Sequence, residues 1–469
     1  MDRTENDDTP RSRSSPDRRA TTRAWLALAL LAGCQGYAPA PLDPEAHHAA
    51  WFGRELERET LAEFVERLDG GARADLAGFD ARDGLSLREG QLVALVHNPA
   101  LRLARLRVAR AAAGAQQAGR WDDPRLDLEL LRVTDDVPDP WVITPGLAFT
   151  LPIGGRLAAE RDLAEAERRA SEGALREAEW GVWRDVRAAW IEWSAALLRV
   201  EATEALVERM RELVATATAL VEQGEVPRGE ASLLLVERSG LENQLRRLTG
   251  EAEALEQELR VLLGLAPSVA LELVPTLEPD DDADEASAEA LDARNLGLAR
   301  LRLEYEVAEQ DLRHEVRRQV PDLTLGPLFE SDQGQSRIGL LGGIPIPMLN
   351  ANRRAIAEAQ VARELARAEV ETGFEVLVGR LAAAQARAAA LAGQLDDMRR
   401  VLVPLVDRQL DDALALMRLG EGASTLVLLS SLQSAYQTRL DLIDTRSDAA
   451  LARTQVAFLV GPQTTEVHE

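Results

Sequence analysis

The chain has 469 residues and a formal net charge of −25, and all of its 54 basic residues are arginine. This acidic balance argues against nucleic acid as a partner, because binding to phosphates requires a basic surface. Apolar residues make up 46% of the chain and aromatic residues only 4%, so the apolar content is mostly Ala, Leu and Val. Together with abundant Arg and Glu, this composition favours long, closely packed helices.

The N-terminus combines a basic stretch, a short apolar run and a single cysteine. Basic residues up to Arg23 precede an apolar run over 24–32, which is too short for a transmembrane helix but suits the core of a signal peptide. The only cysteine of the chain, Cys34, follows Ala32-Gly33, and this sequence resembles the lipobox at which bacterial lipoproteins are cleaved and acylated. We predict a signal peptide over 1–33, a lipid anchor at Cys34 and an N-terminal extension over 34–84. An ordinary cleaved signal peptide, or a buried cysteine, is the alternative.

The rest of the chain contains an internal duplication. Residues that match at a spacing of 197 include Pro and Gly as well as helix formers: Asn98 and Asn295, Arg105 and Arg302, Pro124 and Pro321, Leu262 and Leu459, Gly264 and Gly461. Pro and Gly in register across a whole half are much harder to obtain by chance than matches among Ala and Leu. We predict repeat 1 over 85–266, a Pro- and Asp-rich linker over 267–288, repeat 2 over 289–462 and a tail over 463–469.

Each repeat is predicted to begin with a helix, over about 87–120 and 289–319, that a proline ends. Two alternating segments follow, predicted as strands over about 125–133 and 142–152 in repeat 1, and over about 322–330 and 337–346 in repeat 2. In the first of these, for example, Leu126, Leu128 and Leu130 alternate with Asp127 and Glu129. Such alternation is typical of barrel strands that face lipid on one side, and a soluble hairpin is the alternative. Four strands cannot close a barrel, so several chains would have to pool their strands.

Very long helices follow the strands in each repeat. Residues 156–223 contain no proline, and apolar residues recur every three or four positions, as in coiled coils. Such a helix would be about 100 Å long. A hairpin tip over about 222–228 ends it, and a return helix runs to Leu263. Repeat 2 follows the same order from Asn352, with a kink at Pro404 and a tip over about 418–425.

The sequence offers no catalytic or cofactor site. It contains no phosphate-binding loop, no G-x-S-x-G and no H-E-x-x-H motif. Of the five histidines, only the adjacent pair His47 and His48 has a partner at a spacing typical of metal ligands. Four tryptophans repeat along one helix, at 180, 183, 190 and 193, and we interpret them as packing residues rather than as a platform for a ligand. We therefore predict a protein that is not an enzyme and has no cofactor and no metal ion.

Taken together, these features resemble the outer-membrane efflux protein family, the TolC-like export ducts, over about residues 85–462. Residues 87–101, with Asn98-Pro99, look like the opening helix of the family. Residues 149–156 and 344–353 resemble its strand-to-helix joints, and residues 418–426 resemble its periplasmic hairpin tip. No single motif is highly specific, but the duplicated order of all of them is.

The resemblance implies a mainly α-helical fold with a small β part, in which two repeats each contribute a coiled-coil helical hairpin and two strands. It implies a homotrimer whose strands are pooled in an outer-membrane β-barrel that continues as a helical tube across the periplasm. A periplasmic adaptor would contact the hairpin tips and join the duct to an inner-membrane pump, for efflux or for secretion of the type I kind. The residues expected at this contact are Gly224, Glu225, Val226, Gly420, Glu421 and Gly422.

One segment departs from the pattern of the family. Members often carry acidic residues shortly after the second tip, where they narrow the entrance of the tube, but here an apolar stretch occupies the position. We therefore expect an apolar constriction at Thr425, Leu426 and Leu429 instead of a ring of carboxylates.

A lipid-anchored coiled-coil scaffold or tether in the periplasm, without a pore, remains the alternative for the whole protein. The four alternating segments favour the duct, because a tether has no use for strands with one apolar face.

Overall fold

The computed structural model describes residues 36–54, 84–135, 137–138, 140–269, 271–278, 286–332, 335–419 and 425–462. The chain divides into two units, Met1–Trp51 and Phe52–Glu469. In the first unit the described residues contain most of α2 (Pro44–Phe52), a helix without buried residues. The predicted signal peptide, the predicted anchor Cys34 and the tail over 463–469 lie outside the described residues.

Each repeat begins with two helices in place of the single one that the sequence predicts. They are α5 (Leu87–His97) and α6 (Pro99–Gln117) in repeat 1, and α9 (Ala288–Arg294) and α10 (Leu296–Arg317) in repeat 2. The break falls at Asn98, whose side-chain oxygen accepts hydrogen bonds from the N–H groups of Ala100 and Leu101. An asparagine cap followed by proline starts a new helix, so the prediction of an unbroken helix was wrong here.

Residues that match between the repeats make matching contacts. The side-chain amide of Asn98 donates to the carbonyl of Leu262 at 2.8 Å, and that of Asn295 donates to the carbonyl of Leu459 at 2.7 Å. In each repeat a glycine with positive φ then lies directly against the backbone of the first helix. The spacing of 197 residues seen in the sequence therefore recurs in the tertiary contacts.

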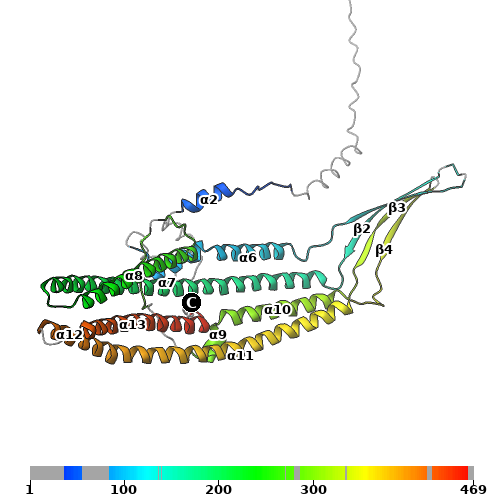
Figure 1. The fold of residues 1–469 in the computed structure, drawn as a ribbon. Helices are drawn as coiled ribbons and strands as arrows, with labels where there is room; N and C mark the ends of the chain where they lie inside the picture. Colours follow the sequence, from blue (N-terminus) through cyan, green and yellow to red (C-terminus); the bar gives the residue numbers. More distant parts are fainter. Residues whose placement is uncertain are drawn as a thin grey trace, which may run out of the picture. The chain divides into compact units, whose positions relative to one another are not determined.

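Long helices form a hairpin in each repeat (Figure 1). Repeat 1 has α7 (Arg156–Gln223), which is 68 residues long, and α8 (Arg228–Leu262). Repeat 2 has α11 (Arg353–Asp397), a π-helical turn η1 (Met398–Leu402), α12 (Val403–Leu419) and α13 (Thr425–Val460). The π-helical turn lies just before Pro404, which lacks the N–H group that a regular helix needs at that place. The interruption predicted at Pro404 is therefore a change of helical type.

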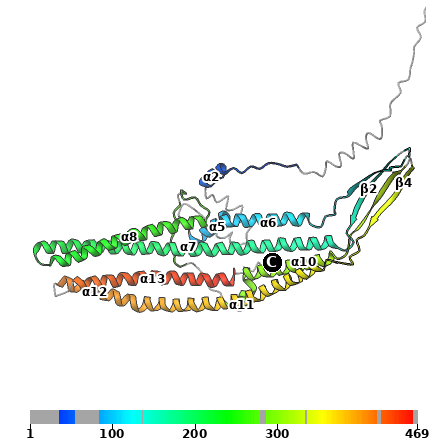
Figure 2. The same cartoon turned by 45° about the vertical axis from the view of Figure 1, so that its right-hand side comes forward.

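The strands form one antiparallel sheet in the order β1 (Arg125–Arg132), β2 (Trp141–Leu151), β3 (Leu323–Asp332) and β4 (Gln335–Gly343). Within the second unit, the sheet extends from one end of the long helices (Figure 2). The two repeats meet at β2 and β3, where Gly146 pairs with Leu328 and Phe149 with Leu325. The predicted fold class is confirmed: a mainly helical chain with long helices and four antiparallel strands.

The tryptophans of α7 are packing residues, as the sequence predicts. Trp190 is fully buried and donates to the carbonyl of Val274 at 2.9 Å. Trp180 stacks on Trp183 with ring centroids 4.1 Å apart and donates to the carbonyl of Phe458 at 3.0 Å. These contacts connect α7 with the linker and with α13.

Among the described helices, none combines the length and the apolar composition that a transmembrane helix needs.

Candidate functional site

The sheet has an exposed apolar face and two open edges. On β1, Leu126, Leu128 and Leu130 are all exposed, Leu128 to 69%. On β4 at the other edge, Ile338 is exposed to 87% and Leu340 is also exposed. Among the described residues, β1 pairs only with β2 and β4 only with β3, so the outer edges present unpaired backbone groups. An apolar sheet face of this kind is suited to contact with lipid or with another protein chain.

Exposed aromatic side chains lie at both ends of the first strand pair. Trp121 precedes β1 at the end of the sheet next to the helices, and Trp141 begins β2 at the far end. The guanidinium of Arg132 lies 5.7 Å from the ring centroid of Trp141. Aromatic residues at both ends of apolar strands are typical of strands that cross a lipid layer.

The first hairpin tip is a tight, exposed turn. Gly224 ends α7 with φ 77°, and the N–H of Glu225 donates to the carbonyl of Leu220 at 2.9 Å. With Gly224 in this left-handed conformation, the N–H groups of Gly224 and Glu225 donate to carbonyls in the last turn of α7, so the end of the helix is capped within the turn itself. Glu225 is exposed and Val226 half-buried, and Pro227 then directs the chain into α8.

The second tip is described only at its two ends. The predicted tip residues Gly420, Glu421 and Gly422 lie outside the described residues. The hydroxyl of Thr425 donates to a carboxylate oxygen of Glu230 on α8 at 2.5 Å, which joins the second hairpin to the first. Leu426 is exposed to 62%.

Leu429 occupies a different position from the one that the constriction requires. It is only 7% exposed and belongs to a core cluster with Met210 of α7, Leu234 of α8 and Ala413 of α12. A side chain packed between the two hairpins cannot also line a lumen. The prediction that Leu429 lines the constriction was therefore wrong, because Leu429 is a core residue. The expected constriction depends on Thr425 and Leu426.

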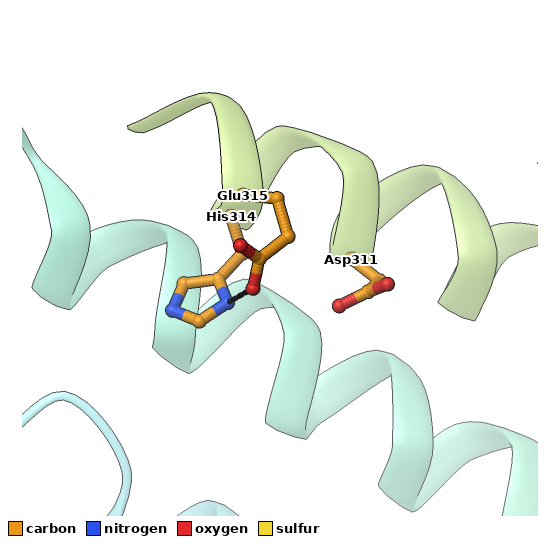
Figure 3. Close-up of side chains that lie close together, drawn as sticks. All are labelled: Asp311, His314 and Glu315. Atoms are coloured by element: carbon orange, nitrogen blue, oxygen red, sulfur yellow. Dashed lines mark ion pairs between the residues drawn. The ribbon is translucent and has the colours of Figure 1, made fainter. Parts of the chain in front are cut away.

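A polar cluster on α10 was missed at the level of sequence. Asp311, His314 and Glu315 project from the same side of the helix (Figure 3), and one ligand atom from each lies within 4.8 Å of the others. Residues at i, i+3 and i+4 share a helix face, so His314 also has partners at a spacing typical of metal ligands. The prediction that only His47 and His48 have such a partner was therefore wrong. That spacing was present in the sequence and is the signal that could have found the cluster.

Glu315 holds this cluster against the strand-to-helix joint of repeat 2. Its carboxylate accepts hydrogen bonds from the guanidinium of Arg318 at 2.8 Å and from the side-chain amide of Asn352 at 2.6 Å. Burial alone would raise the pKa of Glu315, but these hydrogen bonds and the nearby positive charge lower it. Asn352 itself has φ 54°, an unusual conformation for a residue other than glycine.

Comparison with known proteins finds a family match over part of the chain. The model of the family described as outer membrane efflux protein matches residues 93–265, which is most of repeat 1. A search of curated proteins found no significant match.

Solved structures with the same fold cover most of the chain. The outer membrane protein VceC from Vibrio cholerae is 19% identical, with a TM-score of 0.67 over 80% of this chain and 96% of that chain. The CmeC outer membrane channel of Campylobacter jejuni is 14% identical, with a TM-score of 0.69 over 91% of this chain and 93% of that chain. A structure of CusC, described as forming a transmembrane channel, is 18% identical, with a TM-score of 0.68 over 80% and 92% of the two chains.

These likenesses extend the fold beyond the matched segment, across both hairpins and the sheet. The match to the outer membrane efflux protein family is confined to repeat 1, and the solved structures show the fold of the rest of the chain.

Proposed function

We propose that the protein is the outer-membrane channel of a tripartite efflux system. The observation that carries the proposal is a four-stranded sheet with an exposed apolar face and open edges, at the end of two very long helical hairpins. The sheet provides strands that lipid can surround, and the hairpins provide a wall long enough to extend far from the membrane. The family match over repeat 1 supports the same conclusion.

The working unit in this proposal is a homotrimer. A sheet of four strands is too small to close on itself, and its edges at β1 and β4 would be costly in lipid. Pairing β1 of one copy with β4 of the next removes both edges and places the outward-facing leucines in lipid. The helical hairpins of the three copies would then form the wall of a tube that extends into the periplasm.

The exposed tips support a proposal for the partners. A turn with exposed Gly224 and Glu225 and half-buried Val226 suits a contact with a protein, and we propose a periplasmic adaptor there and at Gly420, Glu421 and Gly422. The adaptor would connect the channel to an inner-membrane pump. We further propose that Cys34 is acylated and anchors each copy in the outer membrane.

The entrance of the tube would be narrowed by apolar side chains. Leu426 is exposed near the second tip, and Thr425 lies beside it, bonded to Glu230. Three copies of an exposed leucine around one axis would form a constriction that binds no cations.

The test is the conductance of the purified mature protein in planar bilayers, measured together with its mass in detergent. Discrete channel events from particles with the mass of a trimer are expected. A monomer, or a trimer that gives no channel events, would contradict the proposal and favour the periplasmic scaffold or tether.

The lipid anchor is tested separately, because a channel can form without it. Mass spectrometry of the purified N-terminal peptide should find a lipid-modified Cys34, and the Cys34→Ala variant should lose the modification. A mature chain that starts elsewhere would contradict the anchor and leave the channel unaffected.

A further inference from the structure

The polar cluster on α10 has a composition that neither the fold nor the channel activity requires. Three potential ligands come from one helix face, at i, i+3 and i+4, and none of them caps the helix. Asp311 and His314 are half-buried, and Glu315 is buried. An acidic residue three positions before a histidine on a helix is a spacing that metal sites in helical bundles use repeatedly.

Repeat 1 has no counterpart of this cluster. At the matching positions, 197 residues earlier, it has Gly114 for Asp311, Gln117 for His314 and Ala118 for Glu315. The joint residue Asn352 likewise corresponds to Gly155, which adopts the same left-handed conformation without a side chain. The architecture can therefore be built without these groups, so their presence in repeat 2 needs another reason.

Asp311 and His314 differ in how many of their polar atoms already interact with other side chains. Within the part of the chain that the structure describes, Asp311 has no hydrogen bond or ion pair. His314 has one neighbour of opposite charge, with its Nδ1 3.7 Å from Oε1 of Glu315 (Figure 3), which is too long for a hydrogen bond. Among the described residues, Asp311 and His314 therefore each have a potential metal-ligand atom that makes no hydrogen bond, and both lie beside the carboxylate of Glu315.

Glu315 already accepts hydrogen bonds from its neighbours, and these hydrogen bonds are compatible with metal binding. Its Oε2 accepts from the amide of Asn352, and its Oε1 is shared between Arg318 and the side of His314. A metal ion on Oε1 would displace the guanidinium of Arg318, which is half-exposed and can turn to solvent. Asn352 would remain on Oε2 and hold the carboxylate in place, as neighbouring hydrogen-bond donors do for ligands in metal sites.

The donor set indicates the class of ion. One imidazole nitrogen and two carboxylate oxygens suit first-row transition ions, whereas Ca²⁺ and Mg²⁺ prefer oxygen alone. Bonds to Zn²⁺ of about 2.0–2.2 Å place neighbouring ligand atoms about 3.3–3.5 Å apart. The three atoms lie within 4.8 Å of one another, so binding an ion would require them to move closer together.

We propose that Asp311, His314 and Glu315 bind one divalent transition-metal ion per chain, with water completing its coordination. Bound there, the ion would fix the Glu315 carboxylate that accepts the hydrogen bond from Asn352, and so stabilise the joint between β4 and α11. The proposal does not depend on whether the protein conducts.

The test is titration of the purified full-length protein, without a histidine tag, with Zn²⁺ followed by calorimetry and with Co²⁺ followed by its visible absorption. Both are carried out with His47→Ala/His48→Ala as the parent, since that pair on α2 is a second candidate ligand. Two variants remove one ligand each: His314→Gln, which introduces the residue of repeat 1, and Asp311→Asn. The control is Glu309→Gln, an acidic residue of the same helix that pairs with Arg363.

One Zn²⁺ per chain is expected for the parent and the control, with affinity reduced at least tenfold in both ligand variants. Zn²⁺ should also raise the melting temperature of the parent and not of the ligand variants, because a ligand of the native state stabilises it. Melting curves without metal show whether each variant is folded. Absence of stoichiometric binding to the parent, or equal affinity in His314→Gln, would overturn the proposal.

Discussion

Gly264 and Gly461 are residues at which the backbone permits no side chain. Both have positive φ, and a Cβ on Gly264 would lie 2.1 Å from the carbonyl oxygen of His97. A Cβ on Gly461 would lie 2.2 Å from the carbonyl oxygen of Arg294. The close approach ends each hairpin against the first helix of its repeat, which explains why glycine stands at both positions.

Gly264→Ala is expected to destabilise the protein. The left-handed conformation alone costs a residue with a Cβ about 1–2 kcal/mol, and the contact with His97 adds to this cost. Gly250→Ala is the matched control, since it lies within α8 with nothing near its Cβ position, and it should stabilise the helix by up to about 1 kcal/mol. Thermal unfolding in detergent measures both, and a neutral Gly264→Ala would contradict the argument.

His97 of α5 is a half-buried histidine whose pKa is lowered. Burial, and then the positive charges of Arg54 and Arg105, lower its pKa from 6.5 to about 4. Its Nε2 is buried without a hydrogen-bond partner in the structure. The folded protein therefore keeps His97 neutral over a range in which the unfolded chain binds a proton.

This shift predicts how stability depends on pH. Between pH 6.5 and about 4 the unfolded state binds more protons, so His97 contributes stability above pH 6.5 that is lost as the pH falls toward 4. The melting temperature of His97→Gln should therefore decline less steeply over this range than that of the parent. Above pH 7 the two profiles should run parallel, and equal slopes below pH 6.5 would contradict the prediction.

Among the helices, a regular pattern predicts the bounds of α7, whereas the cap that begins α6 depends on a tertiary contact. The sequence predicts a helix over 156–223, and α7 has these bounds, because its ends are marked by glycines with positive φ. The break at Asn98 was missed, because an Asn-Pro pair within a helical pattern starts a new helix only where its cap can form. The carbonyl of Leu262, which orients Asn98, comes from a distant part of the chain.

The strands allow a test of which face meets lipid. Leu128→Arg places a charge on the exposed apolar face of β1, where an arginine in the middle of a lipid layer costs about 2–4 kcal/mol. The variant should yield less protein in the outer-membrane fraction and fewer trimers that resist detergent on gels. Glu129→Arg, on the opposite face of the same strand, is the control and should assemble normally. Equal assembly of the two variants would contradict a lipid-facing role for the leucine face.

At the scale of the whole molecule, the two hairpins pack on each other near their tips. Tyr436 of α13 bonds to Thr203 of α7 at 2.8 Å and to Gln244 of α8 at 3.0 Å. Leu429 belongs to the apolar cluster that fills the same interface. The side chains left exposed at this end, Leu426 among them, are the ones available to line an entrance or contact a partner.

The entrance should change its response to cations when one side chain is changed. In the proposed trimer, channels of the parent protein should be insensitive to divalent cations, because a ring of Leu426 would offer them no ligand. Leu426→Asp would place three carboxylates around the axis of a trimer, and divalent cations should then block the channel. Leu426→Asn is the neutral control and should not be blocked. Strong block of the parent would contradict an apolar entrance.

The duplicated order of helices and strands can be predicted from the amino-acid sequence alone, because periodicity and the positions of Pro and Gly are local properties of the chain. Which of these residues come into contact depends on the tertiary structure. It paired β2 with β3 across the repeats, buried Leu429 between the hairpins and brought Asn352 to Glu315. Such contacts join residues far apart in the chain, so they depend on how the elements pack and not on the pattern within any one of them.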